Sequence, residues 1–195
     1  MLERYGFLGF LKLGVSLIYT KVFFKQARLI RLPFDIRNKK FIEIGKKFTS
    51  GVGCRIEAYP ENKEKVVFIG ENVQINDYVH ISGMKGVRLG NNVLIASKVF
   101  ISDLNHGNYS DEGSIDSPDT PPSERKLYAK PIIIEDNVWL GEFVSVLPGV
   151  TIGKGSIVGA NSVVSKSLPP NVIAVGTPAK VVKKYNFDTK KWDKV

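Results

Sequence analysis

The chain has 195 residues, of which 43% are hydrophobic and 24% charged, a composition typical of one globular domain with terminal attachments. Its net charge of +9 comes mainly from residues 1–50 and 180–195, and no nucleic-acid-binding motif accompanies it, so we predict no nucleic-acid partner. The single cysteine, Cys54, excludes an internal disulfide and fits a reducing, cytoplasmic location, with its thiol expected as a small buried hydrophobe.

Residues 1–40 form a basic, partly apolar segment that we expect to be helical. Its apolar run, residues 7–24, is interrupted by Lys12 and Lys21. Because a transmembrane helix needs about 20 uninterrupted apolar residues, we do not predict a membrane span. Packing on the body or on a sister subunit is the first interpretation, and peripheral contact with the inner membrane face is the alternative.

Residues 41–182 carry a six-residue repeat. Between residues 134 and 164, aliphatic side chains recur at every sixth position: Ile134, Leu140, Val146, Ile152, Val158 and Val164. A helix would place apolar residues three and four apart, and a half-buried strand would place them two apart. A hexapeptide period with Gly and Asn at the turns is typical of a parallel β-helix, in which each repeat supplies one short strand. The sequence therefore predicts an all-β domain of stacked coils.

A polar insertion at residues 102–130 interrupts the repeat. It begins with Ser-Asp-Leu-Asn-His-Gly and contains His106, one of only two histidines. Long irregular loops within a regular fold are uncommon and are usually functional. A neutral imidazole can accept the proton of an attacking hydroxyl, which accelerates such a step about 10²–10⁴-fold. We therefore predict that this loop is catalytic and that His106 is a general base.

The repeat ends at Leu168-Pro169-Pro170, because proline cannot donate a hydrogen bond into a strand ladder. The basic segment that follows the last turn, residues 183–195, is predicted to form a short C-terminal helix. The two distant histidines and one cysteine show no spacing typical of metal ligands, so no metal site is predicted.

The chain resembles the hexapeptide-repeat acyltransferases in the stretches SDLNHG, VWLGEFVSVLPGVTIGKGSIVGANSVV and LPPNVIAVGTPAKVVKK. Within this family it is most similar to bacterial O-acetyltransferases of lipopolysaccharide O-antigen and exopolysaccharide synthesis. The resemblance covers nearly the whole chain, including KFTSGVG early in the repeat. It implies a left-handed β-helix of triangular cross-section, a homotrimer with active sites between neighbouring subunits, and acetyl-CoA as the donor.

The resemblance also implies site residues for the acceptor. His106 matches the catalytic histidine, whereas the second histidine that relatives often have two residues earlier is here Leu104. Asn76 matches a position that contacts the acceptor sugar, although a structural role at a corner fits it equally well. His80 is expected to have a structural or acceptor-binding role. The weaker candidates for the same cleft are Asp77 and Tyr78.

For the donor, the resemblance implies a site along the coils after the insertion. Trp139 and Gly141 would flank the pantetheine arm, and Ala160 would offer its backbone; Trp139 could equally anchor a trimer interface. Glu142 departs from the small polar residue of some relatives. The other residues implied in acetyl-CoA binding are Ser165 and Lys166, where relatives often have Thr-Lys, and Lys180 and Lys183, as charges for the CoA phosphates.

Taken together, these features predict an acetyl-CoA-dependent O-acetyltransferase acting on a sugar hydroxyl in O-antigen or other surface polysaccharide synthesis. His106 would promote direct attack in a ternary complex, and a backbone N–H would stabilise the oxyanion. Two alternatives remain: an N-acetyltransferase acting on an amino-sugar nucleotide or an antibiotic, and a non-catalytic hexapeptide scaffold.

Overall fold

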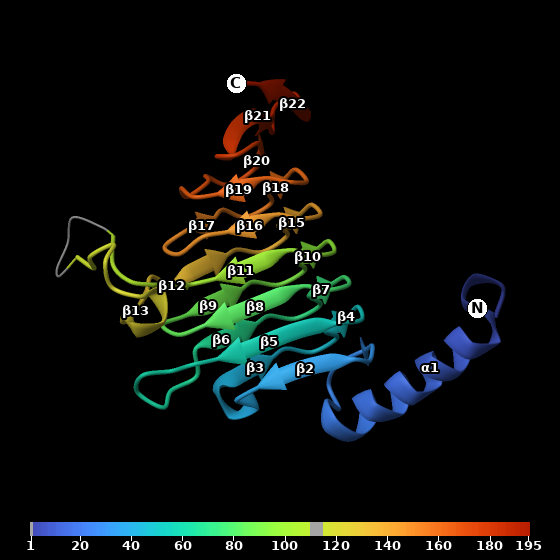
Figure 1. Ribbon diagram of the computed structural model, residues 1–195. Helices are drawn as coiled ribbons and strands as arrows, with labels where there is room; N and C mark the ends of the chain where they lie inside the picture. The colour runs from blue at the N-terminus through green and yellow to red at the C-terminus, as the bar shows by residue number, and fades with distance from the viewer. Residues whose placement is uncertain (1, 110–114) are drawn as a thin grey trace.

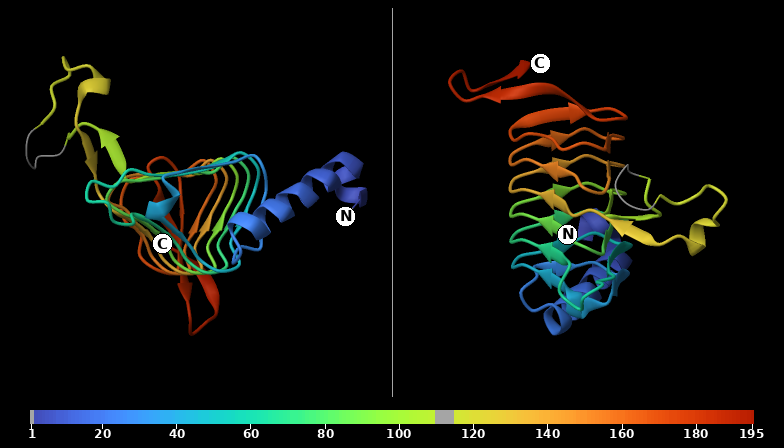
Figure 2. Two further views of the ribbon diagram at one scale, coloured as in Figure 1. Left: turned by 90° about the horizontal axis from the view of Figure 1, so that it is seen from below. Right: turned by 90° about the vertical axis from the view of Figure 1, so that its left-hand side faces the viewer.

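The computed structural model describes residues 2–109 and 115–195, with side chains of the N-terminal helix from Gly6 onward. The centre of the predicted catalytic loop, residues 110–114, and residue 1 lie outside the described residues. Most of the chain winds into stacked coils that form a three-sided prism (Figure 1, Figure 2). Across the front of Figure 1 the strands run from right to left as the chain rises, so the coils are left-handed. The predicted β-helix is confirmed.

Each face of the prism is a parallel sheet. Sheet 1 contains β1 (Leu29–Ile30), β4 (Thr49–Ser50), β7 (Gln74–Ile75), β10 (Leu94–Ile95), β15 (Trp139–Leu140), β18 (Ile157–Val158) and β20 (Val172–Val175). Sheet 2 contains β2 (Phe34–Arg37), β5 (Cys54–Ala58), β8 (His80–Gly83), β11 (Phe100–Ser102), β16 (Ser145–Val146) and β19 (Val163–Val164). Sheet 3 contains β3 (Ile42–Ile44), β6 (Val67–Ile69), β9 (Val87–Leu89), β14 (Ile132–Ile134) and β17 (Thr151–Ile152). The short 3-10 helices are η1 (Lys39–Phe41) and η2 (Pro122–Glu124).

The core is a set of aliphatic stacks running along the prism. In sheet 1, strand pairing aligns Ile75, Ile95 and Leu140, whose side chains are at most 1% exposed. The turns between strands carry residues such as Asn72 and Asn92, whose φ angles are 57° and 56°. Asparagine tolerates this left-handed conformation better than most residues, which explains its recurrence in the repeat.

The solenoid begins earlier than residue 41. β1 pairs with β4 and β2 pairs with β5, so the first coil starts at Leu29. This first coil also explains why a serine, Ser50, occupies an inward position of the repeat: the coil supplies its hydroxyl with a backbone partner. Ser50 is 1% exposed, and its hydroxyl accepts a hydrogen bond of 3.3 Å from the backbone N–H of Arg31.

The N-terminal segment contains α1 (Leu2–Phe23), which is broken by a kink at Gly6 (φ 63°, ψ 174°) and touches the prism near its C-terminal end. There the Ser16 hydroxyl accepts a hydrogen bond from Leu32 N–H (3.1 Å), and the Thr20 hydroxyl accepts one from Ile30 N–H (2.8 Å). The rest of α1 extends away from the prism (Figure 2).

The C-terminal segment is an antiparallel hairpin, so the predicted C-terminal helix is wrong. β21 (Lys180–Asn186) pairs with β20 and with β22 (Lys191–Lys194), which extends sheet 1 beyond the last coil. The Tyr185 ring packs against Phe187 and Trp192, with centroid distances of 4.9 Å and 5.2 Å. Exposed and half-buried residues alternate along most of β21, which is the period of a strand and not of a helix.

Candidate active site

The predicted loop contains an antiparallel pair, β12 (Leu104–His106) and β13 (Leu127–Ala129). We call residues 104–109 and 115–129 the arm; it leaves the prism at the edge between sheets 2 and 3 (Figure 1). Asp103 holds its base, because this buried carboxylate accepts hydrogen bonds of 2.6–2.9 Å from three backbone N–H groups at residues 84–86. Burial raises the pKa of Asp103 although these donors favour its charged form.

The backbone of His106 is held on both sides. Its carbonyl accepts a hydrogen bond from the Tyr109 hydroxyl, to which Arg125 donates at 2.6 Å. Gly107 donates to the carbonyl of Lys126 at 2.9 Å and has a φ of 107°. A Cβ on Gly107 would lie 2.6 Å from the Tyr109 hydroxyl oxygen, so this position needs glycine. The imidazole of His106 is exposed and makes no hydrogen bond with any described residue.

The His106 groove lies beneath the arm on the outer face of sheet 2 and has a volume of about 390 Å³. Strand pairing places Glu57, Ser82 and Ser102 in one column across β5, β8 and β11. Tyr59 and His80 complete the polar lining. The apolar lining consists of Phe100, Leu104 and Leu127. The groove thus offers hydroxyl and carboxylate groups beside an apolar wall and an exposed imidazole.

His80 shares this groove, but both of its ring nitrogens are engaged. Nε2 lies 2.8 Å from Glu57 Oε1, and Nδ1 lies 3.3 Å from an Arg55 nitrogen. A guanidinium only donates, so Nδ1 is the acceptor and the hydrogen-bond network assigns the ring proton to Nε2. His80 therefore has no free nitrogen to accept a substrate proton, whereas the ring of His106 does.

Glu57 is the buried centre of this network. Its side chain is 8% exposed, and Oε2 accepts hydrogen bonds from the Tyr59 hydroxyl (2.9 Å) and from Arg37 (3.3 Å). Burial alone would raise the pKa of Glu57, but the hydrogen bonds from His80 and Tyr59 and the charge of Arg55 outweigh it and lower the pKa. Burial and the bond to this carboxylate in turn raise the pKa of Tyr59.

Four residues of the groove were not predicted from the sequence: Glu57, Tyr59, Ser82 and Ser102. A signal was present in the repeat: Glu57 directly follows the inward Ile56, and Ser82 and Ser102 follow the inward isoleucines of the next coils in the same way. Residues at that position face outward, so three polar residues in register mark a polar column on one face.

Three predicted acceptor residues lie outside the groove, at the edge between sheets 1 and 2, which we call edge 1–2. Asp77 accepts a hydrogen bond of 2.8 Å from Val52 N–H, and Tyr78 is 59% exposed. The thiol of Cys54 donates to the carbonyl of Asn76 at 2.9 Å; this thiol is buried as expected, and burial raises its pKa to about 11. Within one chain, His80 alone of the four acceptor candidates joins His106.

Three predicted donor residues also lie along edge 1–2. Trp139 is 47% exposed on β15, and Gly141 follows at the corner. A Cβ on Gly141 would lie 2.6 Å from the backbone nitrogen of Ala160, so glycine permits the close stacking of these coils. This packing explains the glycine whether or not a ligand uses the same backbone.

The other donor candidates are separated from these. Ser165 and Lys166 follow β19 at the far end of sheet 2, and Ser165 lines a second groove of about 300 Å³ on the arm, together with Tyr128. Lys180 and Lys183 lie on β21 on either side of a register shift, and they pair with Val175 and Ile173, which share a face of β20; the two lysines therefore lie on the same side of the sheet.

Comparisons with known proteins add relatives over the full length. A family model described as "Bacterial transferase hexapeptide (six repeats)" matches residues 131–166. "Putative lipopolysaccharide biosynthesis O-acetyl transferase WbbJ" of Escherichia coli (strain K12) is 48% identical over 192 residues, covering 98% of this chain and 96% of that protein. A galactoside O-acetyltransferase of Lactococcus lactis is 36% identical over 164 residues, covering 82% and 71%.

Solved structures share the fold. The N-acyltransferase AntD from Bacillus cereus, in complex with dTDP and 3-hydroxybutyryl-CoA, matches with a TM-score of 0.67 at 23% identity over 84% of both chains. At this identity the likeness concerns the architecture alone. Among the described residues, no group of three or more His, Cys, Asp or Glu side chains could hold a metal ion.

Proposed function

This chain belongs to the hexapeptide-repeat acyltransferases, and from that membership we propose that it transfers an acetyl group from acetyl-CoA to a sugar hydroxyl in lipopolysaccharide O-antigen or other surface polysaccharide synthesis. The observation that carries the proposal is the 48% identity, over nearly both full lengths, to a protein named as a lipopolysaccharide O-acetyl transferase. The His106 groove supports it, because an exposed imidazole stands beside polar and apolar side chains suited to a sugar.

In the proposed mechanism, His106 is the general base. The acceptor hydroxyl oxygen attacks the thioester carbonyl carbon of acetyl-CoA while the imidazole takes the hydroxyl proton. The tetrahedral intermediate then collapses, the carbon–sulfur bond breaks, and the imidazolium returns the proton to the leaving CoA thiolate. A backbone N–H stabilises the oxyanion. Direct transfer in a ternary complex is consistent with a free imidazole nitrogen at His106 and none at His80.

The active site is proposed to form between subunits of a homotrimer. The site residues of one chain lie on different parts of the prism: His106, His80 and Ser165 lie on sheet 2 and the arm, whereas Asn76 and Gly141 lie on edge 1–2. A ligand that contacts both sets needs them from neighbouring copies, which a closed cyclic assembly provides. Edge 1–2 also carries exposed aromatic side chains suited to an interface, namely Tyr78, Trp139 and Phe143.

The protein is proposed to be cytoplasmic, with α1 making a peripheral contact with the inner membrane face. In α1, residues Gly6–Phe23 have a mean hydropathy of 1.4, and only 11% of them are buried, so the helix is long and apolar enough to cross a membrane by length and composition. Lys12 and Lys21 interrupt it, which favours a surface position. A lipid-linked sugar acceptor fits this placement.

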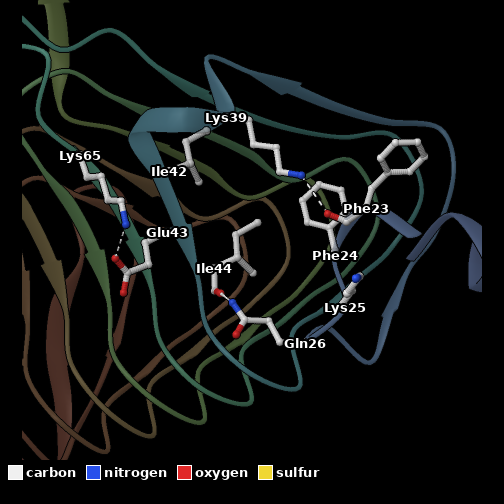
Figure 3. A pocket seen from close by; sticks show the side chains of 9 residues that line it. All are labelled: Phe23, Phe24, Lys25, Gln26, Lys39, Ile42, Glu43, Ile44 and Lys65. Carbon is white, nitrogen blue, oxygen red and sulfur yellow. Dashed lines mark hydrogen bonds and ion pairs between the residues drawn. The ribbon is translucent and has the colours of Figure 1, made fainter. Parts of the chain in front are cut away.

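The base of the first coil next to α1 supports the same contact. A hollow there is lined by Lys25, Lys39 and Lys65 together with Phe23 and Phe24 (Figure 3). Of the two rings, Phe23 is exposed and Phe24 is buried, and lysine side chains beside an exposed apolar ring favour contact with anionic headgroups and the acyl boundary of a membrane.

The proposed activity is tested by incubating the purified protein with acetyl-CoA and a panel of free and lipid-linked hexose and deoxyhexose acceptors, with release of free CoA thiol as the readout. Each acetylated product is then exposed to mild base, which cleaves an ester and leaves an amide intact. A base-labile product is expected. A base-stable product would support the N-acetyltransferase alternative, and binding of acetyl-CoA without transfer to any acceptor would support the scaffold alternative.

A further inference from the structure

The buried serines of this protein are paired, with one exception in the His106 groove. The hydroxyls of Ser50, Ser156 and Ser162 make hydrogen bonds with backbone groups at 2.9–3.3 Å. Ser82 is 4% exposed and lines the groove, and its hydroxyl makes no hydrogen bond with any described residue. Among the described residues only Thr49 Oγ1 is a buried side-chain polar atom without a partner, so the Ser82 hydroxyl is open to the groove and can hydrogen-bond with a ligand there.

The surroundings of Ser82 are rigid. Glu57 on the coil below is held by His80, Tyr59 and Arg37, and strand pairing sets Ser82 directly above it and Ser102 directly above Ser82. Adjacent parallel strands lie about 4.8 Å apart, so the column presents polar groups at a fixed spacing along the prism. A rigid column can distinguish hydroxyl positions on a ring, because it does not adapt to a misplaced hydroxyl.

The groove also has apolar lining beside the polar column. Phe100 is 39% exposed, and its ring lies edge-on to His80 with a centroid distance of 5.4 Å. Leu127, at 38% exposure, extends this surface along the arm next to His106. A pyranose ring has hydroxyl groups at its rim and C–H groups on its faces, so this pairing of a polar column with an apolar wall fits one sugar ring.

We infer that the His106 groove is the acceptor subsite for a neutral pyranose and that Ser82 selects the sugar by hydrogen-bonding one of its hydroxyl groups. Glu57 acts as a positioning residue, because it holds His80 and the floor of the column and has no oxygen free of protein partners. The inference rests on the proposed sugar acetylation and deepens it. The residues of edge 1–2 then complete the subsite from a neighbouring subunit.

The test compares Ser82→Ala with the wild type in steady-state transfer to the preferred acceptor. The acceptor KM is expected to rise about tenfold, because the sugar hydroxyl loses its partner, while kcat and the KM for acetyl-CoA stay within twofold. Thr49→Val is the control: the Thr49 hydroxyl on β4 likewise lacks a protein partner, but it is buried in sheet 1, outside the groove. This control is expected to leave all three constants unchanged.

Acceptors that each lack one hydroxyl identify the contact. One deoxy analogue is expected to raise the KM of the wild type about tenfold and to leave that of Ser82→Ala unchanged, because the two changes remove the same hydrogen bond. An unchanged acceptor KM in Ser82→Ala would overturn the inference about Ser82, and so would an equal rise in KM in both proteins for every deoxy analogue. Either result would leave the proposed acetyl transfer standing. Absence of transfer by the wild type to any sugar would overturn the proposed function as well, so the two failures are distinct.

Discussion

The two histidines of the chain differ in what their ring nitrogens contact, and this difference separates their roles. His80 donates to a buried carboxylate and accepts from a guanidinium, so its ring is a fixed part of the groove floor. His106 stands at the end of β12 with its backbone held by Tyr109 and Gly107 and its ring exposed. A general base needs a nitrogen within reach of the acceptor hydroxyl, and of the two only His106 offers one.

Glu57 links the groove to the stability of the fold. Because its pKa is lowered in the folded protein, its stabilising contribution is complete above the ordinary value near 4.5 and is lost as the pH falls through the lowered value. Glu57→Gln is expected to be less stable than the wild type by about 1–3 kcal/mol at pH 7, with the gap closing at lower pH. Urea unfolding at a series of pH values measures this gap; a gap that does not change between pH 7 and pH 3 would contradict the account.

At the scale of elements, short-range patterns in the sequence predicted the fold well. The six-residue period identified the inward positions of every coil from Ile134 to Val164, because each coil repeats the same local geometry. The polar composition of residues 102–130 located the insertion that bears His106. These features depend only on residues close to one another in the chain.

Features that depend on pairing between distant segments were not predicted. The contact of Glu57 with His80 joins residues 23 apart, and it follows from the register of β5 on β8, which the period alone does not give. The C-terminal hairpin is not predicted from the sequence, because polar and apolar residues do not alternate along β21 and the strand is defined by its pairing with β20 and β22. The separation of Asn76 from His106 also became visible only once three sheets were placed around one axis.

The attachment of α1 makes its role testable without damage to the first coil. Ser16 and Thr20 anchor the helix, so removal of residues 1–15 leaves these contacts and β1 intact. The truncated protein is expected to lose at least tenfold in affinity for vesicles that contain anionic lipid, because most of the exposed apolar surface of α1 is gone. Its transfer rate to a soluble sugar should stay within twofold.

Sedimentation with anionic and with neutral vesicles measures this binding, and the neutral vesicles serve as the control for charge. Release of the full-length protein from membranes by alkaline carbonate would identify a peripheral contact, and retention would identify an inserted helix. Equal vesicle binding by the truncated and full-length proteins would contradict a lipid role for α1.

At the scale of the whole molecule, the placement of site residues on two parts of the prism predicts complementation. His106→Ala and Asn76→Ala should each be strongly impaired alone. Co-expressed in one cell, they should form mixed trimers in which about a quarter of the sites combine an intact arm with an intact edge 1–2, and activity should reappear. Activity equal to the mean of the two single variants would show that each site is built within one chain.

The most direct test of the account is the rate of acetyl transfer by His106→Ala and His80→Ala beside the wild type, with acetyl-CoA affinity measured in parallel. We predict that His106→Ala loses at least ~10²-fold in kcat with unchanged acetyl-CoA affinity, because only the base is removed. His80→Ala should mainly raise the acceptor KM, because the groove floor is disturbed while the base remains. A His106→Ala protein with a wild-type kcat would contradict the assignment of this histidine as the base.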